Sequence, residues 1–252
     1  MYIAVVNASK ELQGQTTAIA AMCSAWTQQL RFHAGPKWGY IPIQATAVKS
    51  APKGVSTILI VDTPDVANAL GYHDVDPHGV PYGRVFVKPI LDNGGTILEG
   101  DNSVSVTGSH EILEMYGDWG ANLWADDGTG KQYALEFCDA VEGDSYVIKA
   151  GTTNVSVSNF VLPSWFRPNP PDNQFDYLRK LEKPFSMDTG GYLLYREAGE
   201  VQSVEGEKSF GWHLKSAFGE DYPEWRKPGK THPSTRTARR GRGHQVASEL
   251  VK

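Results

Sequence analysis

The segment SVSVTGSHEILEMYG, residues 103–117, decides the expected fold, because its residues recur at helical spacing. His110 and Glu114 are four positions apart, so in a helix they project side by side from one face. An adjoining face carries the apolar residues that would turn toward a core, namely Val106, Leu113 and Tyr116. The segment therefore predicts a helix with one buried face and one face that presents a His and a Glu.

The His110 and Glu114 pair can hold one metal ion, and Glu111 leans toward the place of a metal-bound water. The pattern His110-Glu111-Ile112-Leu113-Glu114 resembles the metal-binding helix of zincins, which usually have a second His where this chain has Glu114. A carboxylate ligand makes the bound water less acidic and admits Mn or Fe as well as Zn. We expect a metal site with Zn as the first candidate, His110 and Glu114 as ligands and Glu111 as the catalytic base.

A third protein ligand would leave one coordination position open for catalysis. In the zincins called gluzincins this ligand is a Glu a few tens of residues beyond the helix, and Glu136 matches that separation. Residues 121–125 and 132–137 predict a hairpin, and the alternation along its second arm places Glu136 opposite the apolar face. Glu136 is therefore the expected third ligand, and the alternatives are Asp118, Cys138 and Asp139.

The segments before the motif helix predict an α/β (α+β) fold. They comprise strands at 2–6, 41–48 and 55–61 and an amphipathic helix from residue 18 that Gly35-Pro36 would end. Residues 72–83 are rich in Asp, His, Pro and Gly, and we expect a solvated loop there rather than an ion site, since nothing fixes the backbone as a cage. Residues 84–91 predict an edge strand, because they contain a proline.

This order of elements also resembles that of zincins. In zincins a strand, a helix, further strands and an edge strand precede the metal-binding helix, and the edge strand pairs with an extended substrate. The resemblance implies a zincin-like mixed sheet with an active-site helix, in which residues 84–91 would line the cleft.

Seven segments spread over most of the chain resemble an uncharacterised family of bacterial and phage proteins with a zincin-like HExxE helix. They are residues 82–86, 91–95, 109–111, 122–128, 133–136, 157–161 and 218–223. The resemblance implies that the whole length is one inherited unit, but it brings no established activity. Phage membership adds a second hypothesis, that of a virion component which kept or lost a hydrolase site.

The C-terminal end of the chain differs from the rest in charge. Residues 225–252 carry a net charge of +7 and the preceding residues carry −12. We expect three parts: a zincin-like domain at 1–162, a β-rich extension at 163–225 packed on the same domain, and a basic tail at 226–252. The tail could bind nucleic acid or an assembly partner.

The composition excludes several classes of protein. No run of 18 apolar residues occurs, and the N-terminus lacks the pattern of a signal peptide, so we expect no membrane span and a cytoplasmic or virion-associated protein. Two cysteines make a disulfide framework improbable. Two hypotheses remain: a metal-dependent hydrolase of peptides or proteins, and a structural protein of a phage particle or another assembly.

Overall fold

A five-stranded sheet is the centre of the fold in the computed structural model, which describes residues 1–65 and 69–205. Its order is β2-β1-β3-β5-β4, and its strands are β1 (Tyr2–Asn7), β2 (Gln44–Val48), β3 (Thr57–Val61), β4 (Gly71–Val75) and β5 (Pro81–Phe86). β1, β2, β3 and β5 run parallel, whereas β4 is antiparallel to β5 at the edge of the sheet. The chain therefore has the mixed sheet that the sequence predicts.

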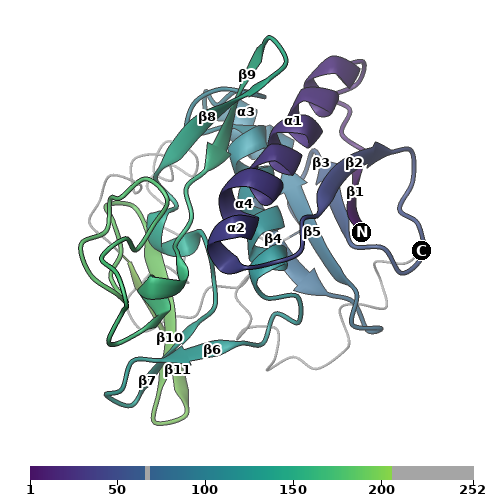
Figure 1. Ribbon diagram of the computed structural model, residues 1–252. Helices are drawn as coiled ribbons and strands as arrows, with labels where there is room; N and C mark the ends of the chain where they lie inside the picture. The colour runs from purple at the N-terminus through teal and green to yellow at the C-terminus, as the bar shows by residue number, and fades with distance from the viewer. Residues whose placement is uncertain (66–68, 206–252) are drawn as a thin grey trace.

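Two helices, α1 and α4, pack against this sheet and against each other (Figure 1). The helices are α1 (Thr16–Gln28), α2 (Gly35–Trp38), α3 (Val87–Asp92) and α4 (Val104–Gly117), with a π-helical turn, η1 (Gln29–Ala34), between α1 and α2. The expected helix end at Gly35-Pro36 is wrong. Pro36 lies in the first turn of α2, where its missing N–H costs no hydrogen bond, so the helical path continues to Trp38.

The helix predicted at residues 103–116, with Gly117 as its stop, is confirmed as α4, and close packing on α1 fixes its orientation. Its first turn is capped by Ser103, whose side chain accepts a hydrogen bond from the Val106 N–H at 3.3 Å. A Cβ at Gly108 would overlap the Trp26 ring, so glycine is required where the two helices meet. The Trp26 indole N–H also donates to the Ser105 carbonyl at 3.0 Å. These contacts set the direction in which the polar face of α4 points.

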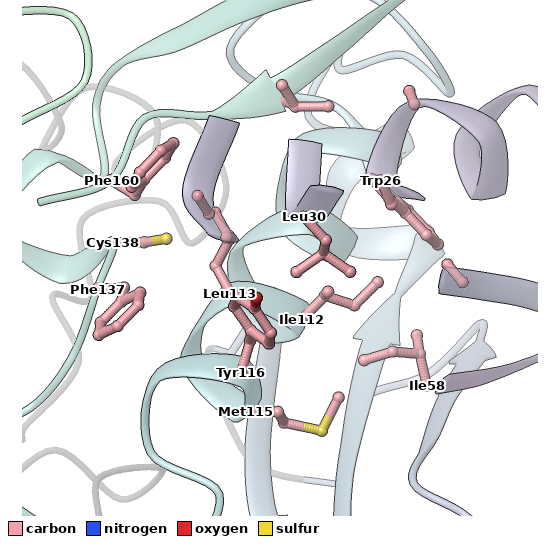
Figure 2. Close-up of a cluster of buried hydrophobic side chains, with 14 of the residues drawn as sticks. Trp26, Leu30, Ile58, Ile112, Leu113, Met115, Tyr116, Phe137, Cys138 and Phe160 are labelled. Atoms are coloured by element: carbon pink, nitrogen blue, oxygen red, sulfur yellow. The ribbon is translucent and has the colours of Figure 1, made fainter. Parts of the chain in front are cut away.

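The core lies between the two helices and the sheet. Figure 2 shows Trp26 of α1, Ile112 of α4 and Ile58 of β3 gathered there, and all three are fully buried. On the other side of α4, Phe137 and Cys138 are fully buried as well, so the segment after β7 closes over the motif helix.

The edge strand of the sheet is β4, and the expectation that residues 84–91 form it is wrong. Residues 84–86 belong to β5, which pairs on both sides, and Pro89 lies in α3. The expected loop at 72–83 instead contains most of β4 and the start of β5. Asp, Pro and Gly, in which this segment is rich, are rare in central strands, but an edge strand beside a polar site tolerates them.

Two smaller sheets complete the described structure. One has the order β11-β10-β7-β6 and is formed by β6 (Trp124–Asp126), β7 (Lys131–Ala134), β10 (Tyr192–Glu197) and β11 (Glu200–Glu205). The other is the hairpin of β8 (Ser145–Ala150) and β9 (Thr153–Ser158), and two short 3-10 turns are η2 (Asp139–Val141) and η3 (Pro163–Phe166).

The pairing of β10 with β7 joins the expected extension to the segment that follows α4. The rest of that extension, residues 206–225, and the basic tail at 226–252 lie outside the described residues.

Candidate metal centre

Three side chains meet at the polar face of α4 and could hold a metal ion. They are His110 and Glu114 of α4 and Asp139 of η2, and one ligand atom from each lies within 4.8 Å of the other two. His110 Nε2 is 3.7 Å from Glu114 Oε1 and 3.2 Å from Asp139 Oδ1. Ligands of a tetrahedral ion with bonds of 2.0–2.1 Å lie about 3.3 Å apart. The observed separations of the His110 nitrogen from the two carboxylates are close to that value.

Backbone N–H groups hold Glu114 in this position. The N–H of Phe137 donates to Glu114 Oε2 at 2.7 Å, and the N–H of Cys138 donates to Oε1 at 2.6 Å. A Cβ at Gly117 would overlap the Phe137 ring, so the last turn of α4 leaves room for this segment. Each carboxylate oxygen has a second lone pair, which leaves Oε1 able to bind an ion. The residue after this segment is Asp139, which is thereby brought to His110.

The pKa of His110 shows how acidic its surroundings are. Burial by itself would lower this pKa, but a hydrogen bond with Asp139 and the charges of Glu111, Asp139 and Glu142 raise it to about 9. Without an ion, the imidazole therefore carries a proton at neutral pH. A divalent cation would replace that proton as the positive charge of the cluster.

The pKa of Glu114 is raised well above its ordinary value, first by burial and then by the charges of Glu136 and Asp139. A hydrogen bond with Glu136 raises it further. Several buried carboxyl groups therefore compete for protons in the metal-free protein. The negative charge of these carboxylates would attract a cation, and because metal ligands must be deprotonated, binding would release the protons that the cluster holds.

Glu111 is packed between α4 and the edge strand. It is 5% exposed, and its Oε2 lies 3.5 Å from His73 Nδ1. Burial raises the pKa of Glu111 to about 8, although the charge of His110 opposes the shift. A carboxylate with a pKa near the working pH is suited to act as a general base.

Glu136, the expected third ligand, lies beside the group of three. Its Oε2 is 3.7 Å from His73 Nε2, and it shares a hydrogen bond with Glu114. The strand argument that placed it does not hold, because β7 ends at Ala134 and the alternation stops there. The carboxylate that the structure brings to His110 is that of Asp139, one of the three alternatives, and ligation by Glu136 stays a prediction.

The other two alternatives have different surroundings. Asp118 accepts hydrogen bonds from three backbone N–H groups of the loop after α4, those of Gly120, Asn122 and Leu123, at 3.2, 2.8 and 2.5 Å. The Cys138 thiol lies 3.9 Å from the His110 carbonyl, and burial raises its pKa well above the ordinary value. Asp118 thus organises a loop, and Cys138 stays protonated behind the motif helix.

Two residues of the site were not expected from the sequence. His73 belongs to the segment expected to be a solvated loop, yet its side chain is only 11% exposed. Tyr192 of β10 donates a hydrogen bond to Asp139, and burial together with the charges of Asp139, Glu142 and Glu136 raises its pKa well above the ordinary value. The two His and two Asp of residues 72–78 were a signal for His73, whereas nothing in the sequence around Tyr192 indicated a site.

Comparisons with known proteins give no relative for this chain: no family model, no curated protein and no solved structure matches it. Within the described residues, no helix has both the length and the apolar character needed to cross a membrane. The site is therefore interpreted from its own geometry.

Proposed function

We propose that this protein is a metal-dependent hydrolase with a zincin-like site that acts on peptide bonds. The observation that carries the proposal is the group formed by His110, Glu114 and Asp139, with one ligand atom from each within 4.8 Å of the others. One neutral imidazole and two carboxylates would balance the charge of a divalent ion. We propose Zn as that ion, and Mn or Fe also suit a donor set with two carboxylates.

Each residue of the site has a role in this proposal. His110, Glu114 and Asp139 hold the ion, which would supply an acidified water and polarise the scissile carbonyl. Glu111 takes the proton from the attacking water, and its buried position next to the ligands supports this role. Glu136 hydrogen-bonds to Glu114 and keeps that ligand oriented.

The fold supports both the zincin-like assignment and a peptide substrate. A strand, a helical segment, further strands and the edge strand β4 precede α4, as the resemblance to zincins implies, although the internal strand β5 and the short helix α3 lie between β4 and α4. β4 lies at the edge of the sheet, and its residue His73 faces the base Glu111. An extended peptide can add to an edge strand as a further strand, which would place its backbone beside the proposed base.

The test combines metal analysis with hydrolysis by the purified full-length chain. We expect near one transition metal per chain, lost in His110→Ala and retained in His78→Ala, which removes an exposed histidine outside the site. We expect Glu111→Gln to retain the metal and to lose hydrolysis of an unstructured peptide by a factor of roughly 10²–10⁴. A wild-type protein that binds no metal, or equal hydrolysis by the wild type and Glu111→Gln, would overturn the proposal.

A second candidate is a structural protein of a phage particle or another assembly, anchored by its basic tail. The observation that favours it is the charge separation of +7 in residues 225–252 against −12 in the rest. In that case the zincin-like scaffold would serve without catalysis, since one fold can carry different functions. Metal content and hydrolysis separate the two candidates.

A further inference from the structure

We propose that His73 is a positioning residue that holds the carboxylate of Glu111 in place from the edge strand. The proposal rests on the hydrolase function proposed above, in which Glu111 is the base. It adds to that function a residue outside the metal group and outside the motif helix. It also gives β4 a part in catalysis beyond contact with the substrate.

The imidazole of His73 lies between two carboxylates. Its Nδ1 is 3.5 Å from Glu111 Oε2, and its Nε2 is 3.7 Å from Glu136 Oε2. All three side chains are largely buried, with exposed fractions of 11%, 7% and 9%. These distances become those of ion pairs when the imidazole carries a proton and the carboxylates are ionised, and electrostatic attraction is stronger in a poorly solvated space than in water.

The glycines around His73 show that the sheet is shaped to receive Glu111. Gly71 precedes His73 by two residues and so shares its face of β4. A Cβ at Gly71 would lie 2.6 Å from Glu111 Oε1, and one at Gly83, which pairs with His73 across the ladder, would lie 3.4 Å from Glu111 Cβ. One carboxylate oxygen therefore rests over Gly71 and the other faces His73, so β4 contacts both oxygens of the base.

A packing role alone does not explain a histidine at this position. Burying an imidazole between carboxylates costs desolvation, and an apolar residue would fill the same space without that cost. The contact with Glu136 also matters, because Glu136 hydrogen-bonds to the ligand Glu114. His73 thus connects Glu111 to Glu136, which is the hydrogen-bond partner of the proposed ligand Glu114. Loss of residues that support metal ligands in this way usually lowers metal affinity or activity by 10- to 100-fold.

The experiment compares metal-loaded full-length variants at position 73. We expect His73→Ala to lower kcat by about 10- to 100-fold with KM within about twofold of the wild type and with bound metal unchanged. The amide nitrogen of Asn can take the place of Nδ1 and that of Gln the place of Nε2. His73→Asn should therefore recover more of the activity than His73→Gln, and His78→Ala, on an exposed residue, is the matched control.

A crystal structure of each metal-loaded variant gives a readout that does not need turnover. We expect the Glu111 carboxylate to leave its place over Gly71 in His73→Ala and to keep it in His73→Asn and His78→Ala. A wild type that binds metal without hydrolysis would defeat the proposed function, while the position of Glu111 would still decide the role of His73. An unmoved Glu111 in His73→Ala, or equal recovery by Asn and Gln, would overturn this inference.

Discussion

Raising the pH should destabilise the metal-free protein, and Glu111 should cause a measurable part of that loss. The pKa of Glu111 is about 8 in the folded chain against 4.5 for an ordinary glutamate, since burial disfavours its charge. A group whose pKa is raised by folding stabilises the fold below its unfolded pKa, and this contribution is lost as pH rises through the folded pKa. At about 1.4 kcal/mol per pKa unit, the loss between pH 4.5 and pH 8 is roughly 2–5 kcal/mol.

The assay is urea unfolding with a chelator present, at intervals from pH 5 to pH 9. The free energy of unfolding of wild type is compared with that of Glu111→Gln, which lacks this titration, so that contributions of groups distant from Glu111 cancel. His110 changes stability in the same direction, because its pKa is raised from 6.5 to about 9, and part of that rise comes from the charge of Glu111. The comparison therefore reports the titration of Glu111 together with its effect on His110. The free energy of unfolding of the wild type should fall relative to that of Glu111→Gln as pH rises.

Saturating Zn should remove most of this pH dependence, because the ion takes the place of the protons held by the cluster. A difference between wild type and Glu111→Gln that stays constant from pH 5 to pH 9 would refute the reasoning. It would mean that the carboxylate of Glu111 is solvated in the folded protein and is not held between α4 and β4.

Two further predictions concern the packing of α4 and the basic tail. Gly108→Ala should lower the free energy of unfolding by about 1–3 kcal/mol, because its Cβ would overlap the Trp26 ring. Urea unfolding measures this loss, and Ser24→Ala, on the exposed face of α1, is the control. A Gly108→Ala variant as stable as the wild type would contradict the described packing. Truncation before Arg226 should leave thermal unfolding of the remainder nearly unchanged and abolish binding to nucleic acid or an assembly partner, with the intact chain losing the same binding as salt is raised. A truncated chain that associates like the intact one at low and high salt would show that the tail takes no part in binding.

The sequence predicted the motif helix well because its signals are local. The spacing of His110 and Glu114 fixes their relation within one turn of helix, and Ser103 and the apolar stripe mark the start and the buried face. No long-range information was needed to place these two side chains together.

The carboxylate that joins His110 and Glu114 was harder to predict from the sequence, because its position depends on where a strand ends. The alternation that favoured Glu136 required β7 to continue to residue 137, but the strand stops at Ala134. The chain then turns so that two N–H groups reach Glu114, and Asp139 follows at the start of η2. The alternation of apolar and polar residues along a strand cannot show where its pairing with the neighbouring strand ends.

His73 was missed for a different reason. Its segment reads as a loop, and only the pairing of β4 with β5 brings its imidazole to the motif helix. The mistaken edge strand had the same origin, since Pro89 lies in the first turn of α3, directly after β5, and does not mark the edge of the sheet. Sheet order is a long-range property, and local patterns in one sequence do not show it.

The contact between Tyr192 and Asp139 has a consequence for the order in which the protein matures. Synthesis reaches Asp139 after His110 and Glu114, but the tyrosine that hydrogen-bonds to Asp139 follows more than fifty residues later, on a strand that pairs with β7. A nascent chain that ends before β10 therefore has its donor atoms without the hydrogen bond that orients one of them. The site reaches the geometry described above only when β10 has been synthesised and has paired with β7, so metal binding at this site, if it depends on that geometry, would follow synthesis of the C-terminal strands.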